Sequence, residues 1–221
     1  DVLGDGLKKT IVREIRVEDL LGRDEIQINT GEIAKNFADK VVMVTGAAGS
    51  IGSELCRQLV TFGVSHLVLF DNAETPMHEL RLELEKKFPD LKFAPFIGDV
   101  RQKERLRMAF EKYHPMVVFH AAAYKHVPLM EISPAEAVKN NVFGTKNLLT
   151  SAAEHGVERF VQLSTDKAVN PTNVMGCTKR LCEMLIQSFA SGTDMKCVAV
   201  RFGNVLGSHG SVIPLFEEQI K

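Results

Sequence analysis

Short apolar runs alternate with segments of helical period along most of the chain. The apolar runs lie at residues 41–46, 66–71, 93–99, 116–122, 160–164 and 197–202. Continuous apolar character over so few residues is typical of strands that are buried on both faces. Helical periodicity fills the intervals at residues 50–62, 76–88, 102–113, 134–155 and 178–190. The pattern therefore predicts six strands separated by helices.

Strands that alternate with helices through short connections form a parallel sheet with right-handed crossovers. We therefore expect an α/β fold, a doubly wound parallel sheet of the Rossmann type, over residues 40–221. Residues 1–39 are more highly charged and lack a long periodic stripe, so they are predicted to form an amino-terminal arm or linker. Within this arm, residues 12–26 favour one short strand or helix packed on the main domain.

Composition and charge remove several classes of function. The chain has 221 residues with 27 basic and 28 acidic side chains, and a net charge of −1 provides no overall field to attract nucleic acid. No apolar run approaches the roughly 18 residues that span a bilayer, so we expect no membrane contact from this chain. The four cysteines form no CxxC pair and have no histidine at zinc spacing. They predict reduced thiols in a cytoplasmic protein, and we expect no metal site.

A glycine-rich turn follows the first predicted strand and opens the next helix. Gly46 suits a tight turn, Gly49 lets the backbone approach a pyrophosphate, and Gly52 lets the helix pack closely on the strand. The helix amino terminus, with Ser50 and Ile51, then faces the anion. A purely structural turn is the alternative, but the flanking strand and helix and an acid at the end of the next strand favour dinucleotide binding.

That acid is Asp71, the last residue of the second predicted strand. A carboxylate at this position accepts hydrogen bonds from both ribose hydroxyls and repels a 2′-phosphate, which favours NAD over NADP. The neighbouring Asn72 is included in the expected cofactor site. The alternative is that Asp71 only caps the following turn.

The ends of the third and fourth predicted strands extend the expected cofactor site. Asp99 and Val100 are placed to meet the adenine, although Asp99 also suits the cap of the next helix. Ala121, Ala122 and Ala123 are small enough to let a cofactor lie against the backbone, with tight packing as the alternative.

The most distinctive segment, STDKAVNPTNVMGCTK, follows the fifth predicted strand at residues 164–179. Together with the TGxxGxxG turn, the HAAA strand end and Asn141, it resembles the extended short-chain dehydrogenase/reductase superfamily. STDKA, NNVFGTKNL and VRFGNVLGSHGSVIPLF are similar, more narrowly, to polysaccharide-biosynthesis nucleotide-sugar 4,6-dehydratases acting on UDP-N-acetylglucosamine. The resemblance runs from about Val17 to the last residue. It implies a lyase that uses NAD to make a 4-keto-6-deoxy sugar nucleotide for surface polysaccharide.

The resemblance also implies roles for the residues of this segment. Lys167 would be the base that takes the C5 hydrogen, and Asp166 the acid that helps the 6-hydroxyl depart. We expect desolvation to lower the pKa of Lys167 and burial to raise the pKa of Asp166. Lys179 matches the lysine that holds the nicotinamide ribose. A solvated surface pair of Asp166 and Lys167 is the alternative.

The sequence departs from the superfamily at Met175, four residues before Lys179, where a tyrosine base is usual. A thioether neither accepts nor donates the proton. Thr165, at the same strand end, is the candidate replacement, with a hydroxyl bonded only to nearby backbone as the alternative. A subset of these dehydratases is similar in carrying Met here, which favours retained catalysis.

The resemblance makes a UDP-sugar the expected substrate. The candidate substrate-binding residues are Lys125, His126, Asn141, Met175 and Asn204. Asn141 is placed to hold a water or support Lys179, with an Asn that only faces a neighbouring helix as the alternative. For Lys125 and His126 the alternative is a solvated pair in a loop. Asn204 follows the sixth predicted strand. The resemblance further implies a homo-oligomer, a smaller substrate-binding part largely absent from this chain, and a parent protein anchored to the inner membrane. We therefore expect this chain alone to be inactive.

Two other functions fit part of the pattern. A nucleotide-sugar 4-epimerase shares the cofactor and the oxidation at C4 but needs no acid for C6, so the pair of Asp166 and Lys167 argues against it. A catalytically silent dinucleotide-binding module is favoured by Met175.

Overall fold

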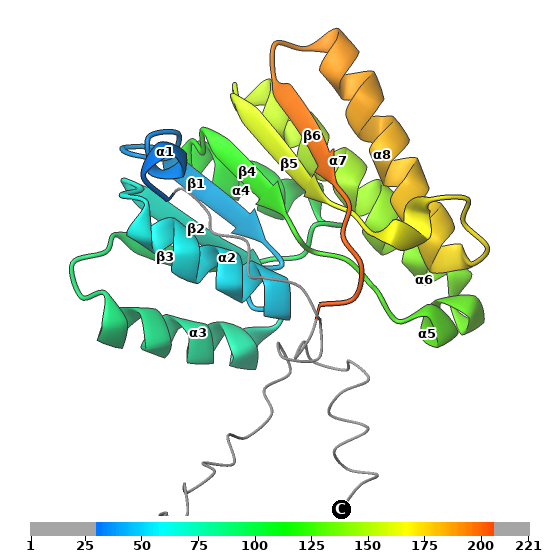
Figure 1. Cartoon of the computed structure of the whole chain (residues 1–221), viewed down its shortest axis with the longest axis horizontal. Helices are drawn as coiled ribbons and strands as arrows, with labels where there is room; N and C mark the ends of the chain where they lie inside the picture. The colour runs from blue at the N-terminus through cyan, green and yellow to red at the C-terminus, as the bar shows by residue number, and fades with distance from the viewer. Residues whose placement is uncertain (1–29, 206–221) are drawn as a thin grey trace, which may run out of the picture.

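The computed structural model describes residues 30–205, which form one six-stranded sheet flanked by helices (Figure 1). The strands are β1 (Val41–Thr45), β2 (His66–Asp71), β3 (Phe93–Ile97), β4 (Val117–His120), β5 (Arg159–Leu163) and β6 (Lys196–Val200). Every pair is parallel, and the order is β3-β2-β1-β4-β5-β6. The order reverses between β1 and β4, where a doubly wound sheet forms a crevice at the carboxyl ends of its strands. The predicted Rossmann fold is confirmed.

Helices cover both faces of this sheet. They are α1 (Thr30–Ala34), α2 (Ser50–Thr61), α3 (Glu74–Lys87), α4 (Lys103–Tyr113), α5 (Val127–Ile132), α6 (Pro134–Ala137), the π-helix η2 (Val138–Phe143), α7 (Gly144–Glu154), the 3₁₀ turn η3 (Asp166–Ala168) and α8 (Val174–Gly192). Helices α2 and α3 pack against one face, while α4, α7 and α8 pack against the other.

The continuous apolar runs arise because successive strand residues point to opposite, equally buried faces. In β1, Val42 and Val44 pack with Cys56 and Leu59 of α2, whereas Met43 packs in the cluster on the other face. All three β1 side chains are fully buried. Two apolar cores, one on each face, therefore hold the carboxyl ends of the strands in fixed positions.

Three helical segments differ from the sequence-based expectation. The helix predicted at 134–155 is divided into α6, η2 and α7, because a π-helical turn interrupts its α-helical hydrogen bonding. Helix α5 was not predicted, since only Met130 of its six residues is buried and no clear periodic stripe results. Helix α8 begins before the expected position because the side chain of Asn173 caps it, accepting a hydrogen bond from the amide of Gly176 at 2.8 Å.

Part of the expected amino-terminal arm is seen in α1 and the turn that follows it. Phe37 packs against the core on the α2 side of the sheet, and its ring stacks on Phe62 with centroids 6.0 Å apart. The strand or helix expected at 12–26 lies outside the described residues. Within residues 30–205, no helix has the length and apolar character needed to cross a membrane.

Candidate dinucleotide and sugar site

The glycine turn after β1 requires glycine at two positions for steric reasons. Gly46 has a φ of +70°, and a Cβ there would lie 2.5 Å from the amide nitrogen of Ala122 at the end of β4. A Cβ on Gly52 would lie 2.0 Å from the carbonyl oxygen of Gly46. Both contacts are with backbone, so neither position tolerates a side chain without moving the turn. The tight turn and the close packing of the helix that the sequence predicted are confirmed.

A hollow of about 230 Å³ lies over the carboxyl ends of β1 to β4. Its lining includes many of the expected cofactor residues: Gly46, Gly49, Asp71, Asn72, Asp99, Val100, Ala121, Ala122 and Ala123. Ser50, Ile51 and Gly52 form the first turn of α2, and no side chain caps that helix at Gly49. The amino terminus of α2 therefore presents backbone amides to an anion beside the hollow.

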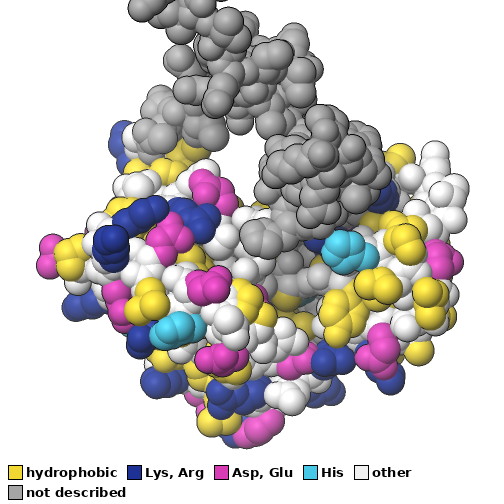
Figure 2. Space-filling model, turned by 90° about the horizontal axis from the view of Figure 1, so that it is seen from below, with side chains coloured by type: hydrophobic (Ala, Val, Ile, Leu, Met, Phe, Trp, Pro, Cys, Tyr) yellow, Lys and Arg dark blue, Asp and Glu magenta, His cyan; other side chains and the backbone are white. Residues whose placement is uncertain are grey.

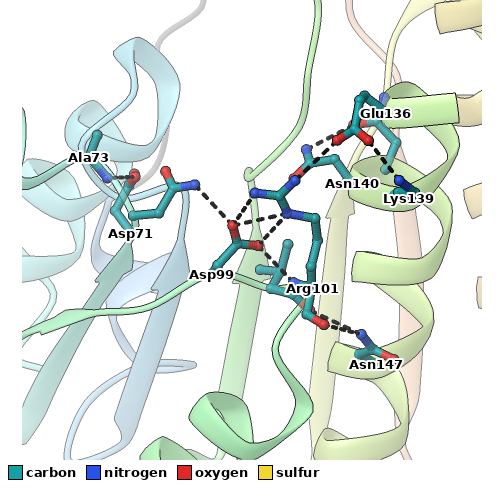
Figure 3. Close-up of polar contacts among 11 residues, drawn as sticks. Asp71, Ala73, Asp99, Arg101, Glu136, Lys139, Asn140 and Asn147 are labelled. Carbon is teal, nitrogen blue, oxygen red and sulfur yellow. Dashed lines mark hydrogen bonds and ion pairs between the residues drawn. The ribbon is translucent and has the colours of Figure 1, made fainter. Parts of the chain in front are cut away.

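Asp71 fixes the glycine turn and the start of α3 together. Its Oδ2 accepts a hydrogen bond from the amide of Ala48 at 2.9 Å. Its Oδ1 accepts one from the amide of Ala73 at 2.9 Å (Figure 3). The carboxylate thus caps the next turn and also lines the hollow. Each carboxylate oxygen has a further lone pair with which to bind a ribose hydroxyl.

Asp99 and Arg101 form an ion pair at the rim of the same hollow. The guanidinium of Arg101 reaches Asp99 Oδ2 at 2.6 Å and Glu136 of α6 at 3.3 Å, so it links the end of β3 to α6 (Figure 3). Asn72 also donates to Asp99, at 3.3 Å. Hydrogen bonds from Arg101 lower the pKa of Asp99, so this carboxyl is ionised at neutral pH. Sequence reasoning missed Arg101; its position two residues after Asp99 was the available signal.

The Thr165–Asp166–Lys167 segment forms a hydrogen-bonded cluster after β5. Thr165 donates from Oγ1 to Asp166 Oδ1 at 2.8 Å and accepts from the amide of Lys167 at 3.3 Å. The ammonium of Lys167 lies 3.3 Å from Asp166 Oδ1 and 3.2 Å from Asn204 Oδ1. Asn204, a predicted substrate residue from beyond β6, thus meets the predicted catalytic pair.

The expectation that burial raises the pKa of Asp166 is wrong. Its side chain is 58% exposed, and hydrogen bonds, first from Thr165 and then from Lys167, lower its pKa. The side chain of Lys167 is 37% exposed, so the expected desolvation is also incomplete. Asp166 and Lys167 therefore form an acid–base pair that is accessible to solvent.

Lys179 is buried directly behind this cluster. Its ammonium donates to the carbonyl oxygen of Leu163, the last residue of β5, at 2.6 Å. Burial lowers the pKa of Lys179. The backbone of Lys167 also contacts α8, because a Cβ on Gly176 would lie only 2.3 Å from the carbonyl oxygen of Lys167. The structure therefore brings Lys167 and Lys179 to the same strand end, as the sequence predicted, and shows why Gly176 has no side chain.

Met175 is buried away from solvent, with 4% of its surface exposed. It packs with Met130 and Ala137, and Tyr124 lies against the same cluster. The position at which the superfamily usually has a tyrosine base is therefore filled by a buried apolar side chain, which offers no proton-transfer group.

The remaining predicted substrate residues lie between β4 and η2. Lys125 and His126 are exposed before α5. Asn141 accepts from the amide of Tyr124 at 2.8 Å, and it donates to the carbonyl of Tyr124 at 3.0 Å and to Thr178 Oγ1 at 2.9 Å. Its side chain thus reaches Lys179 only through Thr178, the preceding residue of α8. The π-helical turn places Asn141 where it can hold the Tyr124 peptide.

At the end of the molecule that carries the site, the described side chains in view form no large patch of a single charge (Figure 2). Acidic and basic side chains are interspersed over it in Figure 2, which views the molecule from below Figure 1. Among the described residues, no three His, Cys, Asp or Glu side chains gather as metal ligands. The described side chains of the site offer hydrogen bonding, acid–base transfer and anion binding.

A family model described as polysaccharide biosynthesis protein matches residues 42–221. The chain belongs to this family. It is 48% identical over 223 residues to the capsular polysaccharide biosynthesis protein CapD of Staphylococcus aureus. The matched region covers 100% of this chain and 37% of CapD. It is 42% identical over 193 residues to the UDP-glucose 4-epimerase of Rickettsia rickettsii, covering 84% of this chain and 54% of the epimerase.

A solved structure shows the same fold. The UDP-glucose 4-epimerase of Brucella ovis in complex with NAD is 27% identical with a TM-score of 0.64, covering 75% of this chain and 52% of the epimerase. The chain is an extended short-chain dehydrogenase/reductase of polysaccharide biosynthesis. The chain spans 37% of CapD and about half of each epimerase.

Proposed function

We propose that the complete protein catalyses NAD-dependent 4,6-dehydration of a UDP-sugar, UDP-N-acetylglucosamine, for surface polysaccharide synthesis. The observation that carries this proposal is the ion pair of Asp166 and Lys167, with Nζ and Oδ1 3.3 Å apart, beside the buried Lys179. Loss of water from C5 and C6 of a 4-keto sugar needs one group to take a proton and another to give one. The pair places both groups at one strand end: Lys167 takes the C5 proton as the neutral amine, and Asp166 gives a proton after it has received one from the sugar 4-hydroxyl through Thr165.

The residues around the hollow fit a dinucleotide. Gly49 lies at the uncapped start of α2, and the small side chains of Ala121 to Ala123 leave backbone accessible along the lining. The bound dinucleotide supplies the acceptor and donor of hydride. Asp71 supports the choice of NAD, since a carboxylate held by two amides repels a ribose 2′-phosphate.

Lys167 is proposed as the base at C5 and Asp166 as the acid at the 6-hydroxyl. In the open site, hydrogen bonds hold the pKa of Asp166 below its ordinary value, which is the wrong direction for an acid. A sugar that covers the pair would exclude water from it. Desolvation raises the pKa of the carboxyl, so Asp166 keeps a proton that it receives and can give it to the 6-hydroxyl.

Thr165 is proposed to take the role of the tyrosine base, since the position usual for that tyrosine holds Met175 in this chain. Its hydroxyl already donates to Asp166 at 2.8 Å, so a proton path from the sugar 4-hydroxyl to a carboxylate is available. The positive charge of the neighbouring Lys179 would lower the cost of an alkoxide at this strand end.

A 4-epimerase is the second candidate, supported by the 42% identity to the Rickettsia rickettsii epimerase. That reaction needs oxidation at C4 but no proton exchange at C5. A catalytically silent dinucleotide-binding module is the third candidate, supported by the packing of Met175.

One experiment separates the three. The complete protein is incubated with NAD and UDP-N-acetylglucosamine in deuterated water, and the sugar nucleotides are analysed by NMR. A 4-keto-6-deoxy product with deuterium at C5 supports dehydration, UDP-N-acetylgalactosamine without C5 exchange supports epimerisation, and binding without turnover supports the silent module.

Lys167→Ala is the matching variant, because it removes the proposed base. It should abolish C5 exchange, whereas Lys146→Ala, at an exposed lysine of α7, should not. Normal C5 exchange in Lys167→Ala would refute its role as the base.

A further inference from the structure

Glu183 carries a buried carboxylate that the proposed chemistry does not use. It lies on α8, one turn after Lys179, and its side chain is 4% exposed. Ser164 donates to Oε1 at 2.7 Å. Arg201 donates from Nε to Oε1 at 2.8 Å and from Nη2 to Oε2 at 2.6 Å. A fourth bond comes from Arg180, at 3.0 Å. The carboxylate is therefore fully engaged by three side chains.

These partners come from the segments that end in the catalytic cluster. Ser164 immediately precedes Thr165, and Arg201 is three residues before Asn204. Asn204 in turn contacts the ammonium of Lys167 at 3.2 Å. Glu183 thus connects α8 to Ser164, the residue before the cluster. It also connects α8 to the segment after β6 that contains Arg201 and Asn204.

The backbones of the two segments also continue their pairing beyond the strands. The amide of Ser164 donates to the carbonyl of Val200 at 2.7 Å, and the amide of Asp166 donates to the carbonyl of Phe202 at 3.1 Å. After Phe202, a hydrogen bond between the described parts of the two segments joins the side chains of Lys167 and Asn204. The anchor at Arg201 therefore helps to determine where Asn204 lies relative to Lys167.

Electrostatics exclude Glu183 from proton transfer. Hydrogen bonds from Arg201 are the largest cause that lowers its pKa, to about 2. A group ionised at all physiological pH values neither takes nor gives a proton in a catalytic cycle. A buried carboxylate also keeps its position, because leaving its donors would expose an unpaired charge to an apolar interior.

We infer that Glu183 is a positioning residue of this site, which holds Ser164 and Arg201 so that Asp166, Lys167 and Asn204 keep their mutual geometry. The inference rests on the proposed dehydration, since it assigns Glu183 to the alignment of the acid and base of that reaction.

The test uses the complete protein and the variant Glu183→Gln. The amide retains the size of the side chain but turns an NH2 group toward an arginine donor, so the anchor loses both its charge and an acceptor. Because displacement of reacting groups by about 1 Å costs up to about a hundredfold, we expect kcat for the 4-keto product and C5 deuterium exchange to fall at least about tenfold. The affinity for NAD, measured by calorimetry, should stay within about twofold, because Glu183 does not line the hollow.

Two further variants keep the test decisive. Gln187→Ala, an exposed residue one turn further along α8, is the matched control and should not change any of these quantities. Ser164→Ala removes one hydrogen bond and leaves the ion pair with Arg201, so it decides the question if Glu183→Gln does not fold. We expect a loss of about fivefold in kcat for Ser164→Ala, with unchanged KM and NAD affinity.

The outcomes separate this inference from the proposed function. No C5 exchange in the unaltered protein would overturn both. Exchange in the unaltered protein with normal kcat in Glu183→Gln and Ser164→Ala would overturn the positioning role alone. A parallel loss of melting temperature and NAD affinity with unchanged kcat at saturation would also overturn it, since that pattern indicates a purely structural residue.

Discussion

The ammonium nitrogen of Lys179 lies 2.6 Å from the carbonyl oxygen of Leu163. This bond fixes α8 against the end of β5, two residues before Thr165. Among residues 30–205 it is the hydrogen bond that this ammonium makes, and it uses one of the three N–H donors, so two are available there to bind a ligand at the strand end. A buried cation with free donors beside an acid–base pair is suited to binding a ribose, and this relationship can be tested directly.

Lys179→Met is expected to weaken dinucleotide binding without destabilising the fold. Burial lowers the pKa of Lys179, so the charged form is desolvated at a cost in stability. The carbonyl of Leu163 keeps a second donor, Nε2 of Gln162 at 3.0 Å, and is not left unpaired. We expect an unchanged or higher melting temperature and an NAD affinity about tenfold weaker. A lower melting temperature with unchanged affinity in calorimetry would show a structural role instead.

Gly52→Ala is expected to damage both stability and cofactor binding. The added Cβ would lie 2.0 Å from the carbonyl oxygen of Gly46, and a backbone atom moves only with the turn. Overpacking of this kind costs about 1–3 kcal/mol, measurable by urea unfolding. Gly192→Ala, whose Cβ meets open space at the end of α8, is the control and should not lower stability. Normal NAD binding by Gly52→Ala would contradict the role of this turn.

Most of the sheet could be predicted from the sequence, because burial on both faces leaves a strong apolar signal. Residues Val41–Thr45 read as an uninterrupted apolar run since the two faces of β1 are equally covered. The π-helical turn at η2 left no such signal. It accompanies long-range bonds from Asn141 to Tyr124 and Thr178, and a helical period in one segment contains no information on partners so distant in sequence.

The sequence could place Asp166 and Lys167 at one strand end, but it could not predict their electrostatics. Strand ends and a resemblance were enough to select Asp166 and Lys167, which the structure places 3.3 Å apart. Their exposure depends on what covers the strand end, and this is a property of the tertiary structure. The same holds for Glu183, whose role becomes visible only when Ser164 and Arg201 are seen to meet on it.

Asp71→Asn is expected to change cofactor preference. The carboxylate accepts from the amides of Ala48 and Ala73, one on each oxygen. An asparagine keeps one acceptor oxygen, loses the negative charge and turns an NH2 toward one of the amides. Because a hydrogen bond to a charged group contributes about 1.5–3 kcal/mol, NAD affinity should fall about tenfold or more while NADP affinity rises relative to it. Competition between the two dinucleotides measures the ratio, and an unchanged ratio would leave Asp71 with its capping role alone.

His120 should make stability depend on pH between its unfolded and folded pKa values. Its ring is fully buried between Thr45, 2.7 Å from Nδ1, and Thr145, 3.0 Å from Nε2. Burial, and secondarily the charge of Lys179, lowers its pKa from 6.5 to about 3. In this window the unfolded chain binds a proton that the folded chain does not. The free energy of unfolding therefore falls as the pH drops from 6.5 toward 3.

His120→Gln isolates this contribution, because an amide can bond both threonines and does not titrate. Chemical unfolding is measured at pH values from about 5.5 to about 6.5, above the range in which most carboxyl groups gain protons. The variant should show a shallower loss of stability than the unaltered protein. A residual slope is expected from His66, whose pKa burial also lowers, and the double variant with His66→Gln should remove it. Equal slopes in the His120→Gln variant and the unaltered protein would contradict a neutral, buried His120.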